Sequence, residues 1–439
     1  MENSLKKIVT LQKEGKPIGI YSLCSANRYV IEAAIDLAKK DNSPVLIEST
    51  ANQVNNDGGY TGMTPKDFKK FVEDICVARG FDSNKVFLGG DHLGPLTYVN
   101  LNEEEAMAKA AELIRAYVLA GFSKIHVDTS MKVADDDPNT RLSDEVIARR
   151  GAFLVKNAEE AYKQYKSKNP NAPEIVYVVG SEVPIPGGAI SKNSSTLEVT
   201  RPEDLEASIK TFKEEFDKQG ISDVFDRVIA FVVQPGIEEQ DNGCVDYDRN
   251  KAKDLMNELN KYPNIVFEGH SSDYQSKDKL KELVEDGVAI LKVGPAVTFA
   301  LREGLYALSF IEKELIKDET KRSNFIKVLD DVMLENPNKW ASYYKGTPEE
   351  IGFKRKYSFS DRCRYYIPNK KVDDAINTLI KNLSDKPIPL TLISQYMPIA
   401  YTRIREGKLE NTPVELLKDR IRNCIDEYLY ATKQNELFK

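Results

Sequence analysis

The sequence predicts a (β/α)₈ barrel followed by a mostly helical C-terminal extension. Eight short runs rich in Val, Ile and Leu recur along the chain, and each is followed by a longer segment with helical periodicity. The runs are continuously apolar, which is typical of parallel strands buried on both faces. Eight such strands alternating with helices favour a closed barrel. A doubly wound sheet is the alternative, although it more often has about five to seven strands.

The predicted strands follow in order along the N-terminal part of the chain. They span Ile18–Leu23, Pro44–Glu48, Val86–Asp91, Lys124–Asp128, Ile175–Glu182, Arg227–Gln234, Asn264–Glu268 and Val288–Val293. Between the third and fourth runs, Glu103–Leu119 repeats Ala, Leu and Ile every three or four residues, which predicts an amphipathic helix.

The barrel takes residues 1–305, and we expect residues 306–439 to form a helical region packed on or near the barrel mouth. Helical patterns cover Ser323–Glu335, Lys371–Leu383 and Thr412–Lys433. The polar stretch Lys317–Asn324 is a plausible seam between the two parts.

Composition excludes several classes of protein. With 439 residues, 41% of them hydrophobic, the chain has enough apolar material for a large core, and its net charge of −7 argues against a nucleic-acid binder. The N-terminus has no apolar signal-peptide region, and no run of about 18 apolar residues predicts a membrane span. Five cysteines without a CxxC pair fit a reducing compartment, so we expect a cytoplasmic protein.

Polar residues follow nearly every predicted strand, where barrel enzymes place their active sites. In chain order, the candidate site residues are Ser25, Asn27, Glu48, Gln53, Tyr60, Asp91, His92, His126, Asp128, Glu182, Gln234, His270, Lys292 and Gly294.

The histidines are the sharpest of these signals, because the chain has only three and all lie in or just beyond predicted strands. His92 and His270, with carboxylate or amide oxygens, suggest a metal site. The alternative is that one or two of them are packed, hydrogen-bonded residues. His126 precedes its strand end by two residues, so its side chain could instead point into the barrel.

The acidic and basic residues admit more than one role. Asp91 could carry a proton to or from a substrate hydroxyl, and Glu182 could bind metal or act as a base. Glu48 and Asp128 could orient ligands or cap the following helices. Lys292 could be a Schiff-base lysine, although a carboxylate-rich site with histidines favours metal chemistry.

Two segments could bind an anionic substrate. Gly294 opens a predicted helix directly after the eighth strand, and free N–H groups there favour a phosphate. The segment SDRCRYY places Arg362 and Arg364 in the C-terminal part, where they could close over the substrate or form a contact between domains. No GxGxxG or GxxxxGK[ST] motif is present, which argues against nicotinamide and ATP as cofactors.

Several long blocks of the sequence resemble one family. SLCSANRYVIEAAI, VLIESTANQVNNDGGYTGMTP, LGGDHLGP, GSEVPIPGG, EGHSSDYQ and ILKVGPAVTFALRE are similar to the GatZ/KbaZ family, named for an accessory subunit of D-tagatose-1,6-bisphosphate aldolase in galactitol breakdown. The resemblance runs from Ile18 to about Tyr401. It implies a relationship to class II aldolases, which are zinc-dependent barrels.

Carried over residue by residue, the resemblance assigns roles to the strand ends. Asp91 matches the aldolase proton-handling acid, His92 and His270 match metal ligands, and Asp128 and Glu182 match acidic positions. The third aldolase histidine falls at Gln234. An amide oxygen is a weaker zinc ligand than imidazole, so the metal could be Zn, Mn, Co or Ni.

The favoured function is C4 epimerisation of ketohexose phosphates, between tagatose 6-phosphate and fructose 6-phosphate. The C4 hydrogen is not alpha to the C2 carbonyl, so inversion needs either oxidation or cleavage and re-closure of the C3–C4 bond. Since no nicotinamide motif is present, the sequence favours a retro-aldol route assisted by a divalent metal.

The alternative is a non-catalytic subunit that stabilises a separate class II aldolase chain. Against it, polar groups as dense as those at these strand ends are costly to retain without a use. The expected partners are a phosphorylated ketohexose, a class II aldolase chain and further copies of this chain in a homo-oligomer, with neither nucleic acid nor membrane.

Overall fold

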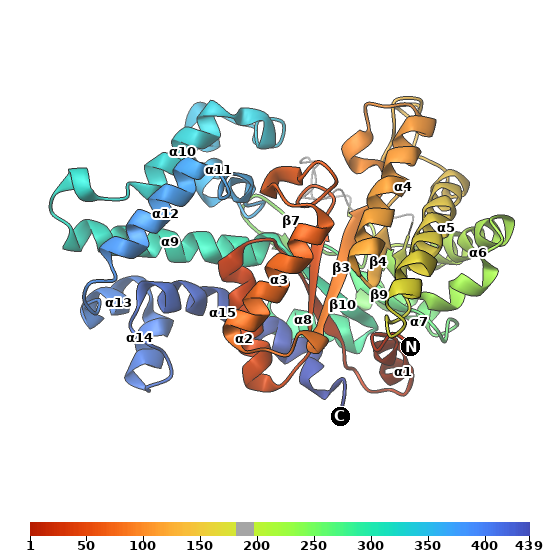
Figure 1. Ribbon diagram of the computed structural model, residues 1–439, viewed down its shortest axis with the longest axis horizontal. Coiled ribbons are helices and arrows are strands. Elements are labelled where there is room, and N and C mark those ends of the chain that lie inside the picture. The colour runs from red at the N-terminus through yellow and green to blue at the C-terminus, as the bar shows by residue number, and fades with distance from the viewer. Residues whose placement is uncertain (181–196) are drawn as a thin grey trace.

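The centre of the fold is a closed barrel of eight parallel strands, as the sequence predicts (Figure 1). The computed structural model describes residues 1–180 and 197–439. Around the barrel the strands follow the order β1–β10–β9–β6–β5–β4–β3–β2. Their bounds are β1 Ile20–Cys24, β2 Val45–Thr50, β3 Val86–Leu93, β4 Lys124–Val127, β5 Val176–Val179, β6 Val228–Val233, β9 Val266–Gly269 and β10 Val288–Val293.

All eight predicted strands are present, but several ends differ. β1 begins at Ile20 instead of Ile18, because the preceding Gly19 donates its N–H to Thr432 of the C-terminal helix and not to a strand. A Cβ at residue 19 would lie 2.3 Å from the carbonyl oxygen of Ala289, so only glycine fits there. β5 ends at Val179, and the predicted strand end Glu182 lies outside the described residues.

Helices connect the strands and form the outer ring. They are α2 Arg28–Asp41, α3 Pro65–Arg79, α4 Glu103–Ala120, α5 Asp144–Lys168, α6 Pro202–Lys218, α7 Arg249–Leu259, α8 Lys277–Glu285 and α9 Pro295–Leu315. Local capping explains several of their ends. Thr64 and Asp67 form a reciprocal capping box at α3, and Gly121, with φ of 96°, ends the predicted α4 helix.

The N-terminal end of the barrel is apolar and closed. Helix α1 (Lys6–Lys13) places Ile8, Val9 and Leu11 against an interior cluster that includes Val176 and Ile290. In Figure 1 this helix lies beside the lower end of the strands, at the N-terminus. With this end filled, the polar C-terminal strand ends at the opposite mouth are free to form a site.

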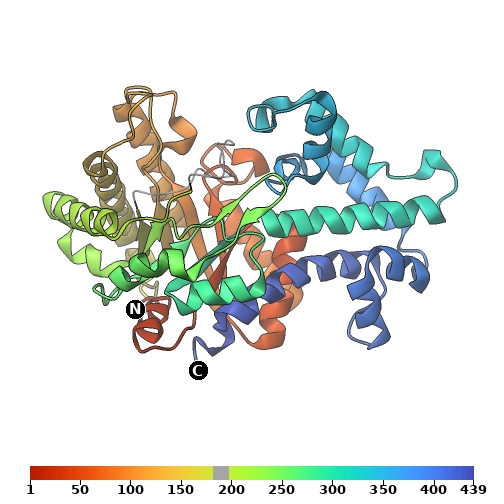
Figure 2. The ribbon, with the colours of Figure 1, turned by 180° about the vertical axis from the view of Figure 1, so that it is seen from behind.

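A two-stranded hairpin interrupts the barrel pattern after β6. It consists of β7 (Glu238–Glu239) and β8 (Cys244–Val245), which are antiparallel. In Figure 2 the hairpin rises from the barrel toward the C-terminal helices. It was not predicted, since two strands of two residues leave almost no periodic signal.

The last third of the described chain is helical. Its helices are α10 Phe325–Glu335, α11 Pro348–Tyr357, α12 Lys370–Asn382, α13 Leu390–Tyr396, α14 Pro398–Arg405 and α15 Pro413–Thr432. Helix α9 passes through residue 305 without a break, and α9 and α15 extend side by side from the barrel (Figures 1 and 2). The division into domains at 305 therefore stays a prediction, and no helix in the described ranges is long and apolar enough to cross a membrane.

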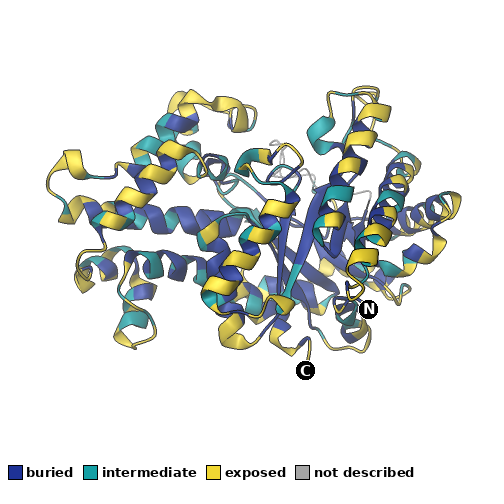
Figure 3. Ribbon diagram, in the orientation of Figure 1, coloured by how far each residue is buried: buried dark blue, intermediate teal, exposed yellow. Residues whose placement is uncertain are grey.

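Helix α15 returns to the barrel and packs against α2, α8 and α9. Its buried Lys418 lies 2.6 Å from Glu415 and 3.2 Å from Asp36 of α2, and Arg422 lies 2.8 Å from the same aspartate. Figure 3 shows buried residues running from the barrel strands along α9 and α15. The C-terminal helix is thus part of the wall around the barrel.

Candidate active site

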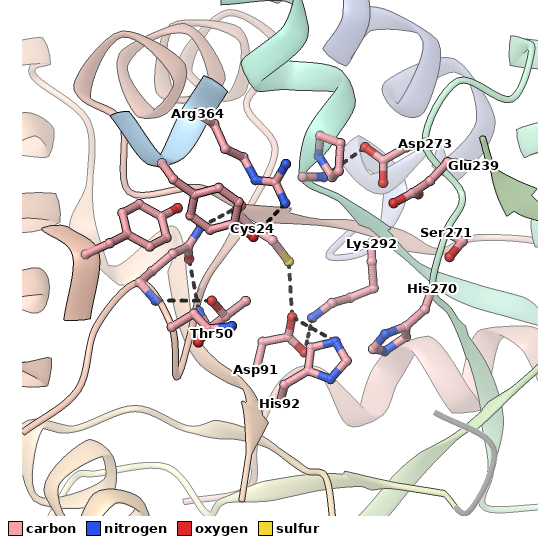
Figure 4. A pocket seen from close by; sticks show the side chains of 16 residues that line it. Cys24, Thr50, Asp91, His92, Glu239, His270, Ser271, Asp273, Lys292 and Arg364 are labelled. Carbon is pink, nitrogen blue, oxygen red and sulfur yellow. Dashed lines mark hydrogen bonds and ion pairs between the residues drawn. The ribbon is translucent and has the colours of Figure 1, made fainter. Parts of the chain in front are cut away.

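A cavity of about 100 Å³ lies at the C-terminal mouth of the barrel (Figure 4). Sixteen residues line it: Cys24, Thr50, Asn52, Gln53, Tyr60, Asp91, His92, Glu239, His270, Ser271, Asp273, Lys292, Gly294, Pro295, Arg364 and Tyr365. They come from the ends of barrel strands, from the β7–β8 hairpin and from the C-terminal region. Many predicted site residues from distant parts of the chain therefore meet in one place.

Three histidine rings form a compact triangle beside this cavity. The ring centroids of His92 and His126 are 4.9 Å apart, those of His92 and His270 are 4.9 Å apart, and those of His126 and His270 are 5.0 Å apart. Together with Asp91, each ring offers a ligand atom within 4.8 Å of the others. These four buried residues are a geometric candidate for a metal centre.

Each histidine is backed by a carboxylate on one ring nitrogen. His92 Nδ1 lies 2.7 Å from Asp128 Oδ2, His126 Nδ1 lies 2.7 Å from Asp91 Oδ1, and His270 Nε2 lies 3.1 Å from Glu268 Oε1. Metal-binding histidines usually have such a partner, which sets the tautomer and the ring orientation.

The opposite ring nitrogens fit a metal. His126 Nε2 is fully buried and has no hydrogen-bond partner among the residues that the structure describes. An unsatisfied buried imidazole nitrogen is costly, and a cation would satisfy it when the ring proton is on Nδ1. Asp91 favours that tautomer, and the backbone N–H of His92, 3.1 Å from the same Nδ1, favours the other one. Three imidazoles and a carboxylate are donors that suit Zn²⁺ and other first-row divalent ions.

The histidines of the triangle differ in their pKa values. Burial lowers the pKa of His270 to about 3, so this ring is neutral at physiological pH. Burial would also lower the pKa of His92, but the carboxylates of Asp91 and Asp128 outweigh it and raise that pKa. The same contacts pull the pKa of Asp128 down to about 2 against the effect of burial, which keeps it ionised.

Asp91 lies between the histidines and a buried lysine. Its Oδ1 is 2.8 Å from Lys292 Nζ, and the thiol of Cys24 approaches Oδ2 at 3.6 Å. Burial would raise the pKa of Asp91, but Lys292, His92 and His126 hold it well below its usual range. The carboxylates around Lys292 likewise outweigh burial and raise its pKa, so Lys292 is an ammonium and not a free amine. This arrangement disfavours the Schiff-base alternative.

Beneath the triangle, a fully buried lysine completes a lattice of alternating charge. Lys124 Nζ lies 2.6 Å from Glu48 Oε1 and 2.6 Å from Glu268 Oε2, and Lys292 contacts Glu48 from the other side. A Cβ at residue 89 would lie 2.5 Å from Glu48 Oε1, so Gly89 makes room for this carboxylate. Glu48 is therefore part of the support for the site and does not cap a helix.

The side of the cavity opposite the histidine triangle, called here the opposite wall, is formed by Glu239, Asp273 and Arg364. Its two carboxyl groups have raised pKa values. Burial and the neighbouring Asp273 raise the pKa of Glu239 to about 8, and burial raises the pKa of Asp273 to about 6. Asp273 Oδ1 accepts hydrogen bonds from the N–H groups of Gly294, at 3.0 Å, and Ala296, at 2.7 Å. The start of α9, where we expected a phosphate, thus already holds a carboxylate of the chain.

The C-terminal region supplies the cation of this wall. Arg364 donates to Tyr365 Oη at 3.0 Å and to the carbonyl oxygen of Asp361 at 3.0 Å. The rings of Tyr365 and Tyr60 meet edge to face with centroids 4.9 Å apart. Burial would lower the pKa of Arg364, but Tyr365 and nearby acids raise it, so the guanidinium stays charged where it borders the cavity.

The backbone is strained at the histidines. His92 has a φ of 48°, and Ser271, which follows His270, has a φ of 57°. The left-handed region costs a non-glycine residue about 1 kcal/mol or more, and such strain gathers at functional sites.

The structure places some predicted residues away from the cavity. Ser25 and Asn27 line a neighbouring cavity of about 350 Å³ that shares Tyr60 and Arg364 with the first. Gln234 does not line the cavity, because its Oε1 accepts from the N–H groups of Gly236 and Ile237. Arg362 is buried with its guanidinium 3.3 Å from the Tyr343 ring centroid, also outside both cavities. Glu182 lies outside the described residues.

Of the predicted metal ligands, His92 and His270 belong to the triangle, Gln234 does not, and Glu182 lies outside the described residues. His126 of β4 takes the place beside His92 and His270 where Gln234 was expected, so the third imidazole comes from inside a strand and not from β6. Its contact with Asp91 explains this, since β3 and β4 are neighbours in the barrel.

Sequence reasoning also missed Lys124 and Glu239, and it gave Asp273 no role. Lys124 had a usable signal, because a lysine within an apolar parallel strand needs a buried partner. Glu239 had none, since it lies on a hairpin that the sequence pattern does not reveal. Asp273 stands three residues after His270, and its distance from the strand end concealed its role.

Fold and site together define the class: a (β/α)₈-barrel protein with a carboxylate-backed histidine cluster at the C-terminal mouth. The model of the D-tagatose-1,6-bisphosphate aldolase subunit GatZ/KbaZ-like family matches residues 5–433, and the chain belongs to that family. The resemblance seen in the sequence is confirmed. Membership connects the protein with sugar-phosphate aldolase chemistry.

Three solved structures match the chain to different degrees. One described as a probable tagatose 6 phosphate kinase from Sinorhizobium meliloti 1021 is 42% identical, with a TM-score of 0.85, and the match covers 94% of this chain and 100% of that chain. A fructose-bisphosphate aldolase from Campylobacter jejuni is 18% identical over 87% and 93%, with a TM-score of 0.43. The fructuronate-tagaturonate epimerase UxaE from Cohnella laeviribosi is 11% identical over 95% and 81%, with a TM-score of 0.49. The fold is shared with the first of these structures.

Proposed function

We propose that this protein is a metal-dependent C4 epimerase of ketohexose phosphates, which interconverts tagatose 6-phosphate and fructose 6-phosphate by retro-aldol and aldol steps. The observation that carries the proposal is the triangle of His92, His126 and His270, each backed by a buried carboxylate, beside a cavity lined by ionised Asp91 and Lys292. A bound divalent ion would supply Lewis-acid stabilisation of the negative charge that develops when the C3–C4 bond breaks.

The chain's own residues have distinct tasks in this reaction. With the three imidazoles as the metal ligands, Asp91 would accept the proton of the C4 hydroxyl, and Lys292, 2.8 Å from it, would hold that carboxylate in position. As the proton leaves, the C3–C4 bond breaks, its electron pair stays with the C1–C3 fragment, and C4 becomes an aldehyde. Addition to the other face of the aldehyde re-forms the bond with C4 inverted.

The substrate phosphate needs a cation, and Arg364 is the residue that best supplies one. The N–H groups at the start of α9 are occupied by Asp273, and Lys292 is held among Asp91, Glu48 and Glu268. Arg364 borders both this cavity and its neighbour, and a guanidinium binds phosphate in a bidentate manner. Tyr60 and Tyr365 would then cover the sugar and exclude water.

The decisive test uses the purified chain alone, loaded in turn with Zn²⁺, Mn²⁺, Co²⁺ and Ni²⁺. We expect NMR to show tagatose 6-phosphate forming from fructose 6-phosphate in a metal-dependent manner, without accumulation of free triose phosphates. Full activity after verified metal removal would refute the metal-dependent mechanism. Free trioses as the main product would make the protein an aldolase instead.

A second candidate function follows from the family description, which names an aldolase subunit. In that role the chain would stabilise a separate class II aldolase chain, and the two roles are compatible. The observation that discriminates them is addition of a purified class II D-tagatose-1,6-bisphosphate aldolase. Inactivity alone under every metal, combined with a gain in aldolase activity or lifetime on mixing, would favour the subunit role.

A further inference from the structure

Within the proposed epimerisation, inversion of C4 places a geometric demand on the cavity. The C5 and phosphate end of the substrate stays held, so the hydroxyl and the hydrogen on C4 exchange places. The C4 oxygen therefore faces one wall in one epimer and the opposite wall in the other. Asp91 serves only one of these positions, and the other needs its own group to exchange a proton.

We propose that Glu239, on the β7–β8 hairpin, is the second proton-transfer residue, and that it serves the C4 oxygen of the epimer whose hydroxyl faces away from Asp91. Figure 4 shows the Glu239 and Asp91 side chains on opposite sides of the cavity, with Lys292 between them. This inference rests on the proposed function and adds a residue of the chain that neither the sequence pattern nor the family description indicates.

The contacts of Glu239 distinguish it from the other acids of the cavity. Asp91 is held by Lys292 and His126, and Asp273 holds the N–H groups of Gly294 and Ala296. Within residues 1–180 and 197–439, no hydrogen bond or ion pair is found for the Glu239 carboxyl, although the residue is only 7% exposed. Its hydrogen-bonding capacity is therefore left for a ligand in the cavity.

Charge around the group supports the role. The charged residues that face it are Asp273, Arg364 and its neighbour Glu238, and burial with Asp273 outweighs Arg364 to raise the pKa of Glu239 to about 8. At neutral pH Glu239 is thus a carboxylic acid, able to donate a proton to an alkoxide. A carboxylic acid that burial keeps neutral can act as a general acid on the side of the cavity opposite Asp91.

The proton balance is complete. In one direction Asp91 accepts the proton from the C4 hydroxyl, the C3–C4 bond breaks, the aldehyde turns, the bond re-forms, and Glu239 gives its proton to the new C4 alkoxide. Asp91 then loses its proton to water and Glu239 regains one from water, which restores both groups. The reverse reaction uses the same groups in the opposite order.

The test compares Glu239→Gln with Glu238→Gln, the matched variant on the same hairpin, whose residue does not line the cavity. Metal-loaded enzymes are given each epimer separately, interconversion is followed by NMR, and borohydride quenching traps the aldehyde fragment. We expect Glu239→Gln to slow interconversion by about 10²–10⁴-fold. Fragment formation from one epimer should stay within about fivefold of wild type and be lost from the other, and Glu238→Gln should behave as wild type.

Other outcomes overturn the inference. One contrary outcome is that Glu239→Gln interconverts the epimers at a rate within about threefold of wild type. Another is that fragment formation falls equally from both epimers. Either would show that Glu239 does not transfer the proton of one epimer's C4 oxygen. Infrared difference spectra give a second readout: a protonated-carboxyl band that disappears above about pH 8 in wild type should be absent from Glu239→Gln. Wild-type enzyme that neither interconverts the sugars nor forms fragments with any metal would refute the proposed function itself, and this inference with it.

Discussion

The two walls of the cavity differ in how far their buried charges are balanced by charges of opposite sign. On the histidine wall, Asp91, Glu48 and Glu268 are each matched by Lys292 or Lys124, and every imidazole has a carboxylate partner. On the opposite wall, Glu239 and Asp273 stand together with raised pKa values, which Arg364 and, for Asp273, the N–H groups of Gly294 and Ala296 offset only in part. The paired charges of the first wall favour a fixed geometry, and the incompletely balanced acids of the second wall are suited to proton transfer.

The largest expected effect comes from removing the third imidazole. His126→Ala should lose bound metal and reduce epimerase activity by about 10³-fold or more, because the cluster loses both a ligand and the partner of Asp91. Metal content by mass spectrometry and the rate by NMR check this. Gln234→Ala is the control, and it should keep its metal. If Gln234→Ala lost its metal and His126→Ala kept it, the ligand would be Gln234, as expected from the sequence, and not His126.

Breaking the charge lattice should cost the next largest amount. Lys124→Met leaves Glu48 and Glu268 without their shared ammonium, so we expect the free energy of unfolding to fall by about 3–5 kcal/mol. Denaturant unfolding with a chelator present isolates this effect from metal binding. Adding Glu268→Gln to Lys124→Met should recover part of the loss, and a single-variant loss below about 1 kcal/mol would contradict the lattice.

On the opposite wall, Arg364→Lys should raise the KM for fructose 6-phosphate by about 10–100-fold with little change in kcat, because a lysine cannot bind phosphate in the bidentate manner. Arg362→Lys is the matched control, since Arg362 lines neither cavity. Steady-state kinetics distinguish the two variants. An equal rise in KM for Arg364→Lys and Arg362→Lys would mean that these arginines act on the site only through packing.

The smallest expected effect is on the pH dependence of the free energy of unfolding. Because the pKa of Glu239 rises from 4.5 to about 8 on folding, the folded state binds the extra proton between these values. The free energy of unfolding therefore falls as pH rises through this window, and stays lower above it. Glu239→Gln removes this penalty, so it should be more stable than wild type by at least about 1 kcal/mol at pH 9 but not at pH 4. Denaturant titrations at both pH values measure this, and a pH-independent difference would contradict the raised pKa.

Much of the site was accessible from the sequence because the barrel imposes a rule. Asp91, His92, His270 and Lys292 each end or follow a continuous apolar run, and parallel strands in a closed barrel bring all such ends to one mouth. His126 was recognised as a candidate, but its role was not, because strand register decides which neighbour an inward side chain meets. Glu239 reaches the mouth from an irregular hairpin, for which no periodic rule exists, whereas Arg364 was a candidate because the SDRCRYY segment gathers two arginines.

The sequence by itself determined the barrel, its eight strands, the main helices and the family, since each rests on local periodicity or on long blocks of residues. Only the tertiary structure decided that His126 and not Gln234 joins the triangle, that Asp273 occupies the start of α9, and that Lys124 lies between two glutamates. These are distances between side chains far apart in the chain. They depend on barrel closure and burial, which set both the neighbours of each charge and its pKa.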